Sequence, residues 1–107
     1  EDGTWTDAIE IGKPINTLKN DDSPEITANG DTLYFASNGH KGMGGYDIFM
    51  SVKTDTTWTK PVNLGTPINS PWDDIYYKYN PLTKKGFISS NRKGGMGEMD
   101  IYIIQGK

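Results

Sequence analysis

Six aspartates near the turns of the chain have the chemistry to coordinate a cation. Asp47 and Asp100 each follow a glycine-rich stretch, and the others form the pairs Asp21-Asp22 and Asp73-Asp74. Calcium takes about six to eight oxygen ligands, but the chain has no EF-hand run of the form Asp-x-Asp-x-Asp-Gly. A carboxylate that closes a glycine loop can instead accept backbone N–H groups of that loop. We therefore predict structural roles for Asp47 and Asp100, with calcium binding as the alternative.

The two glycine-rich stretches, Asn38–Tyr46 and Asn91–Met99, have a composition that phosphate-binding loops share. Such loops direct backbone N–H groups at the anion from the N-terminus of a helix. Here each stretch lies between two β-like segments, and no helical pattern follows it. We interpret the glycines as tight turns that need positive φ angles, and we expect no nucleotide cofactor.

Groups for covalent or metal catalysis are scarce. The chain has no cysteine, its single histidine is His40, and it has no Gly-x-Ser-x-Gly elbow and no zinc ligand set. The run Asp2-Gly3-Thr4-Trp5 resembles a sialidase Asp-box, but its spacing differs and the later copy reads Asp55-Thr56-Thr57-Trp58. A hydrolase would need a carboxylate pair with a raised pKa in a pocket. We predict a non-catalytic protein with no cofactor and no metal site.

The composition favours a lean β-protein. Of the 107 residues 34% are hydrophobic, 13 are glycine and 6 are proline, which favours many turns over long helices. The net charge is −3 and no basic run exceeds Lys84-Lys85, so we expect no binding to nucleic acid. The longest apolar run, Ile101–Ile104, is too short for membrane insertion.

An internal repeat decides the predicted fold class. Shifting the chain by 53 residues aligns 16 identical pairs without a gap; Trp5 falls on Trp58, for example, and Ser37 on Ser90. A period of this length is typical of repeat architectures. We divide the chain into repeats 1–53 and 54–107.

Each repeat offers four short β-like segments separated by turn residues. They are Trp5–Ile11, Glu25–Thr27, Thr32–Ser37 and Asp47–Val52, and then Trp58–Leu64, Ile75–Asn80, Gly86–Ser90 and Asp100–Ile104. Four antiparallel strands per repeat is the plan of a β-propeller blade, so the sequence predicts an all-β fold of two blades. Trp5 and Trp58 anchor the outer strands, and we expect these residues to pack between blades: Leu33, Phe35, Ile48, Phe49, Phe87, Ile88, Ile101 and Tyr102.

Repeated and unrepeated residues suggest different roles. A residue present in both blades usually serves the blade, so we assign structural roles to Asn38 and Asn91. The long connections and the glycine-rich loops share one face, and function often lies on long loops. The candidate partner-binding residues are the unrepeated ones there: His40, Lys41, Trp72, Arg92 and Lys93. Trp72 either contacts a partner protein or covers the seam between blades, and we expect His40 to be solvated.

The residues resemble a known family. Ser23–Asn38 and Gly42–Phe49, with the linking stretch Trp58–Ser70, look like the TolB-type, WD-repeat-like propeller repeat of bacterial envelope proteins. Tyr79–Arg92 resembles the last blades of such propellers in Bacteroidetes-type peptidoglycan-associated lipoproteins of the OmpA family and in a type IX secretion component. Tyr76-Tyr77 in place of Ser-Pro, and Glu98-Met99 in place of Gly-Tyr, depart from the pattern.

The resemblance implies a periplasmic, outer-membrane-associated scaffold that binds protein partners in the cell envelope. The alternative is a carbohydrate- or peptidoglycan-binding module that uses Trp72, Tyr76 and Tyr77 as stacking platforms. If these rings were buried between blades, that alternative would fail.

The repeat starts out of phase with the blade. Trp5–Ile11 corresponds to an outer strand, and the second blade lacks one. Because a propeller needs about four to eight blades, we expect either a fragment of a longer chain or a homo-oligomer. Three copies that each lend Trp5–Ile11 to a neighbour would close a six-bladed ring.

Overall fold

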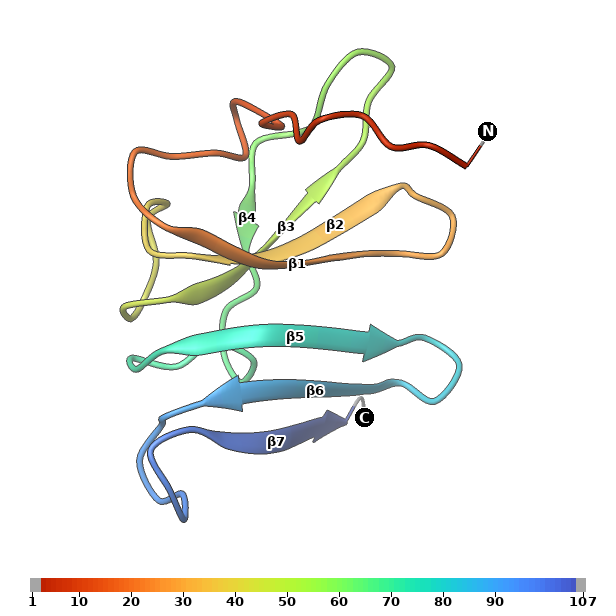
Figure 1. Ribbon diagram of the computed structural model, residues 1–107. Coiled ribbons are helices and arrows are strands. Elements are labelled where there is room, and N and C mark those ends of the chain that lie inside the picture. Colours follow the sequence, from red (N-terminus) through yellow and green to blue (C-terminus); the bar gives the residue numbers. More distant parts are fainter. Residues whose placement is uncertain (1–2, 106–107) are drawn as a thin grey trace.

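The computed structural model describes residues 3–105, and all regular structure in that range is β-strand (Figure 1). The first sheet contains, in spatial order, β1 (Asp21–Ile26), β2 (Thr32–Ser37), β3 (Asp47–Val52) and β4 (Val62–Asn63). The second contains β5 (Asp74–Asn80), β6 (Lys85–Ser90) and β7 (Asp100–Gln105). Every neighbouring pair is antiparallel. Within the described residues there is no helix that could cross a membrane.

Two of the expected outer strands differ from the prediction. Only Val62–Asn63 of the stretch 58–64 joins the first sheet, and Trp58 adds an isolated bridge to Lys53. The stretch 5–11 forms no strand, and the side chain of Trp5 is 95% exposed. A strand needs a ladder partner for its backbone groups. Residues 3–105 offer this stretch no such partner.

The two sheets have the same register after a shift of 53 residues. Asp21 pairs with Ser37 as Asp74 pairs with Ser90, and each first strand is interrupted by a bulge at the same place. The bulges contain Ser23, with φ 44°, and Tyr76, with φ 57°, which lie 53 positions apart. The repeat in sequence is therefore a repeat in backbone geometry.

The core has two parts because side chains alternate between the faces of a strand. On one face of the first sheet, four buried residues pack with Trp58: Ile15, Leu33, Phe35 and Phe49. On the other face, Ala36 and Ile48 meet Tyr77 and Ile88 of the second sheet. Burial of these side chains, each worth about 1.5–3 kcal/mol when apolar, holds the sheets together.

A paired exchange explains the Tyr76-Tyr77 departure. Tyr77 stands where the first repeat has Pro24, and Gly86 stands where it has Leu33. A Cβ built on Gly86 would lie 2.9 Å from Cε1 of Tyr77, so the tyrosine ring occupies the space of the missing side chain. The ring of Tyr34 packs edge-on against it at a centroid distance of 5.3 Å.

The outer face of the second sheet is uncovered. Phe87 and Ile103 are each 48% exposed and Ile101 is 78% exposed. The expected packing of Phe87 and Ile101 between blades is therefore not made within residues 3–105. Their side chains point away from the first sheet, and nothing among residues 3–105 covers that side.

Candidate functional site

The two glycine-rich loops and the connections that precede β1 and β5 gather at one end of the molecule, opposite the short turns of the β1–β2 and β5–β6 hairpins (Figure 1). In the β2–β3 loop, Oδ2 of Asp47 accepts the N–H groups of Met43 and Gly44 at 2.6 and 3.0 Å. In the β6–β7 loop, the carboxylate of Asp100 accepts the N–H of Gly97 at 3.0 Å. Both aspartates therefore close their glycine loops, the role that the sequence indicated.

Asp47 is the more unusual of the two, because only 1% of it is exposed. Its other carboxylate oxygen, Oδ1, is buried and has no hydrogen-bond partner within the described residues. Burial raises the pKa of this carboxyl group, and the nearby charges of Asp74 and Asp73 add to the rise.

Asp21 and Asp74 are the acceptors of a second hydrogen-bond network that occurs in both repeats. The sequence indicated these two residues only as possible calcium ligands. The carboxylate of Asp21 accepts the backbone N–H of Thr17 at 2.8 Å and the hydroxyl of Ser37 at 2.7 Å. Asp74, fully buried, accepts the N–H of Ser70 at 2.8 Å. The signal was present in the sequence: Ser or Thr stands four positions before each aspartate, and Ser stands sixteen after it.

The repeated asparagines join loop to strand in the same way in both sheets. Oδ1 of Asn38 accepts the N–H of Asn20 at 2.9 Å, and Oδ1 of Asn91 accepts the N–H of Asp73 at 2.8 Å. These bonds tie each glycine loop to the connection that precedes the first strand of its sheet. The side chains are thereby used inside the fold, in keeping with structural roles.

The seam between the sheets is polar at this end. Asn69, 1% exposed, accepts the N–H of Ile48 at 2.7 Å and donates to the carbonyl of the same residue at 2.9 Å. Asp73 accepts the N–H of Tyr46 at 2.9 Å, and the backbone N–H of Asp74 donates to the carbonyl of Tyr46 at 2.9 Å. Side-chain amide and carboxylate groups thus satisfy the β3 edge beyond the short strand β4.

His40 is part of the fold and not a solvated loop residue. Its Nε2 lies 2.7 Å from the carbonyl oxygen of Ile15. The ring packs against Phe35 and Phe49 at centroid distances of 5.7 and 5.3 Å. The aromatic face of the first sheet draws the imidazole inward, which corrects the expectation of a solvated histidine, while its partner-binding role stays a prediction.

Arg92 is likewise engaged within the chain. One guanidinium nitrogen lies 2.8 Å from Oδ1 of Asp74, and the guanidinium donates to the carbonyls of Pro67 and Ile68 at 3.0 and 2.6 Å. It also lies over the ring of Tyr102, 5.2 Å from the centroid. These contacts make Arg92 a seam residue, and the first repeat has Gly39 at its position.

The other three unrepeated candidates remain accessible. Lys41 and Lys93 are exposed, and Trp72 is 44% exposed while its backbone N–H donates to the hydroxyl of Ser70. The backbone carbonyl of Trp72 lies against Gly44 in the seam, whereas the Trp72 ring is not buried there. We call Lys41, Trp72 and Lys93 the long-loop surface.

The acidic residues do not assemble a metal centre in the part of the chain that the structure describes. Between residues 3 and 105, no group of three or more His, Asp or Glu side chains is placed to hold an ion. Asp21, Asp73 and Asp74 accept N–H groups of the fold, as described above. Asp22 accepts the N–H of Ser23.

The three aromatic residues suggested for carbohydrate stacking do not share one platform. Tyr77 is only 7% exposed and packs between the sheets, whereas Tyr76 is 61% exposed. Burial raises the pKa of the Tyr77 phenol to about 12, with smaller contributions from Tyr34 and Tyr79. Trp72 and Tyr76 line neither the cleft beside Tyr34 and Tyr79 nor the cleft beside Ile15 and Phe35.

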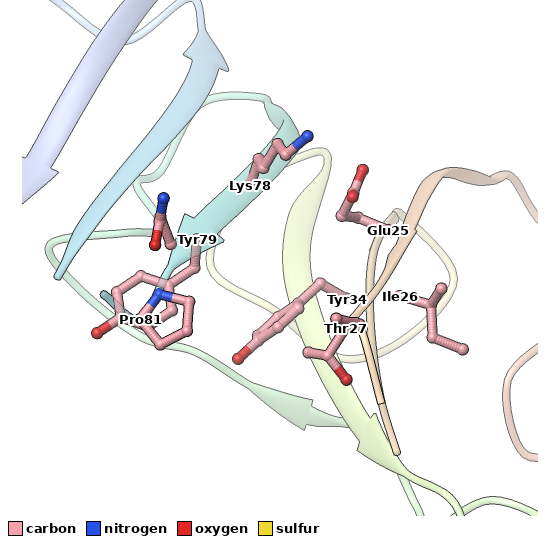
Figure 2. Close-up of a pocket in the computed structure, with 9 residues that line it drawn as sticks. Glu25, Ile26, Thr27, Tyr34, Lys78, Tyr79 and Pro81 are labelled. Atoms are coloured by element: carbon pink, nitrogen blue, oxygen red, sulfur yellow. The ribbon is translucent and has the colours of Figure 1, made fainter. Parts of the chain in front are cut away.

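A cleft of about 360 Å³ opens between the sheets at the short-turn end (Figure 2). Glu25, Thr27 and Tyr34 line it from the first sheet, and Lys78, Tyr79 and Pro81 line it from the second. Glu25 and Lys78 are equivalent in the two repeats, so the cleft has opposite charges on its two walls. Sequence reasoning missed this cleft, because its walls are far apart in the chain.

Comparison with known proteins returned no match: no family model, no curated protein and no solved structure is similar to this chain.

Proposed function

We propose that the chain is a two-blade segment of a β-propeller that serves as a non-catalytic scaffold and protein-interaction module in the bacterial cell envelope. The observation that carries the proposal is a difference between repeated and unrepeated residues at the long-loop end. The side chains of residues shared by the repeats make hydrogen bonds within the fold, whereas Lys41, Trp72 and Lys93 stay exposed. An exposed tryptophan held by a rigid seam is typical of protein-binding surfaces.

The blade assignment rests on two further features. Both sheets are antiparallel with strands in chain order, and they share a register, a bulge position and a glycine-loop geometry. The face of the first sheet that carries Ala36 and Ile48 packs on the opposite face of the second sheet, which carries Tyr77 and Ile88, and neighbouring blades stack in this way. The location in the periplasm, at the outer membrane, is part of the same proposal and rests on the family resemblance of the repeat residues.

The test is site-specific crosslinking in the periplasm of a Bacteroidetes host. A photoreactive amino acid at position 72 is expected to give a discrete adduct with an envelope protein. The same amino acid at position 82 is the control, because Leu82 is 93% exposed on the opposite end. Equal adducts at both positions, or none at position 72, would refute the interaction role.

A second candidate function, carbohydrate binding, is favoured by the cleft in Figure 2. Tyr34, Tyr79 and Pro81 offer flat apolar surface beside the polar groups of Glu25 and Lys78. Sedimentation with isolated peptidoglycan sacculi tests it directly. Binding that Tyr79→Ala abolishes and Trp72→Ala preserves would assign the activity to this cleft and support the second function over the first.

A further inference from the structure

Ile48 and Ile101 hold equivalent positions in the two repeats, yet one is buried and the other exposed. Ile48 is 0% exposed because the second sheet packs on it through Tyr77 and Ile88. Ile101 is 78% exposed and forms, with Phe87 and Ile103, the outer face of the second sheet. The second sheet therefore presents the same apolar surface that the first sheet buries.

A cleft at the other end of the molecule matches the surroundings of Ile48. It measures about 390 Å³ and lies against the first sheet, where Ile11, Ile15, Pro24 and Phe35 are among its lining residues. Adding 53 to each number gives residues of the core around Ile48: Leu64, Ile68, Tyr77 and Ile88. We call this the N-terminal cleft, and it is the counterpart of the pocket that Ile48 fills.

The polar part of the seam is also duplicated. Asn69 brackets the backbone of Ile48 with its side-chain amide, and its own N–H donates to the carbonyl of Gly65 at 2.8 Å. Asn16 makes the same turn, since its N–H donates to the carbonyl of Gly12 at 2.8 Å. The backbone of the segment that would bracket Ile101 is therefore already folded, which lowers the entropy cost of docking. Oδ1 of Asn16 accepts the N–H of Gly12 in the single chain, so this side chain turns to Ile101 on docking.

We propose that the chain binds a second copy of itself head to tail, with Ile101 of one copy inserted into the N-terminal cleft of the next. Residues 5–11 of the second copy then pair along the free edge of β7, where Trp5 and Ile9 lose their exposure of 95% and 82%. The amide of Asn16 takes the N–H and carbonyl of Ile101, as Asn69 takes those of Ile48. Because the two surfaces differ, the contact is heterologous and can close into a ring.

Several positions depart from the template, among them Glu10, which replaces the Asn63 whose Oδ1 accepts from the amide of Asn69. Glu98 stands where the first repeat has Gly45, and a Cβ on Gly45 would lie 2.1 Å from Oδ1 of Asp73. Asn20 replaces Asp73 in the copy that would dock there, so its side chain must adopt another rotamer. Three apolar positions of the cleft keep their apolar character: Ile11 for Leu64, Ile15 for Ile68, and Phe35 for Ile88. Asp22, by contrast, stands in the cleft where the template has Ile75.

The test is complementation between two variants of the 107-residue chain, followed by light scattering during size exclusion. Ile101→Arg blocks the outer face, and Ile11→Arg blocks the cleft; both side chains are exposed in the single chain, at 78% and 45%. The unmodified chain is expected to self-associate, and each variant is expected to bind at least tenfold more weakly. An equimolar mixture of the two should form a one-to-one dimer, because one intact face and one intact cleft remain.

Two controls separate docking from damage to the fold. Leu82→Arg places the same charge on a side chain that is 93% exposed in the β5–β6 turn, and it should associate like the unmodified chain. Circular dichroism should show the same β-structure for all variants. An unmodified chain that stays monomeric at millimolar concentration, or a variant mixture that stays monomeric, would overturn the proposal. Neither result bears on the partner of the long-loop surface.

Discussion

The guanidinium of Arg92 lies 2.8 Å from Oδ1 of the fully buried carboxylate of Asp74. In the first repeat a neutral group stabilises the equivalent carboxylate, because the hydroxyl of Ser37 donates to Asp21. In the second repeat the corresponding hydroxyl, that of Ser90, accepts from Arg92 instead. The arginine thus replaces a serine hydroxyl as the partner of the carboxylate and adds bonds to two backbone carbonyls of the seam.

Arg92→Ala is expected to lower the free energy of unfolding by about 2–3 kcal/mol, because it removes a charged partner from a buried carboxylate. Urea denaturation measures the loss. The double variant Arg92→Ala/Asp74→Asn should lose less unfolding free energy than the sum of the losses of the two single variants, since the two groups interact. Strict additivity would contradict the coupling.

Gly44→Ala is expected to destabilise the chain by about 2 kcal/mol through overpacking. A Cβ at position 44 would lie 2.1 Å from the carbonyl oxygen of Trp72, which belongs to the backbone of the seam. Gly97 is the equivalent glycine of the second sheet, and the nearest atom to its Cβ would be 3.6 Å away. Gly97→Ala should therefore leave the urea midpoint of the monomer unchanged, and equal losses at both positions would refute the argument.

Asp47→Asn is expected to change how stability depends on pH. Since the folded-state pKa of Asp47 is raised above its ordinary value, its contribution to stability is present below that value and is lost as pH rises through the folded pKa. The side chain in Asp47→Asn has no titrating proton, so the unfolding free energy of the variant does not show this loss as pH rises. The difference in unfolding free energy should thus move in favour of Asp47→Asn as pH rises above the ordinary aspartate pKa of about 4, and parallel curves for variant and unmodified chain would contradict it.

Tyr77→Phe is expected to act at alkaline pH. The raised pKa of about 12 means that Tyr77 stabilises the fold below the ordinary tyrosine pKa of 10 and loses that effect as pH rises toward 12. The phenylalanine variant should lose less stability over this range. Spectrophotometric titration of tyrosinate supplies the check: the variant should lack one late-titrating group, and an unchanged late phase would assign that group to another tyrosine.

Much of the fold could be predicted from residue spacing alone. The hairpin strands over 32–37 and 47–52 have the predicted bounds, because alternation and turn residues are local properties. The stretch 5–11 has an equally good strand pattern but forms none. The physical difference is the ladder partner, which residues 3–105 do not offer this stretch.

The residues of the candidate site also fall into two groups: those with a role that local sequence predicts, and those with partners that only the tertiary structure brings near. The roles of Asp47 and Asp100 follow from a carboxylate that closes a glycine loop, and both accept loop N–H groups. The engagement of His40 and Arg92 could not be read from loop composition. Their partners are the carbonyl of Ile15 and the carboxylate of Asp74, which the chain brings near only when the connections fold back over the strands.

By itself the sequence determined the all-β class, the period of 53 residues and the turns, since these depend on local conformational preference and side-chain alternation. The tertiary structure alone decided which copy of each repeated residue is buried. Ile48 and Ile101 hold equivalent positions and each follows an aspartate, but the second sheet covers one and leaves the other in solvent. Burial depends on what packs against a surface, and that is a property of the assembled sheets.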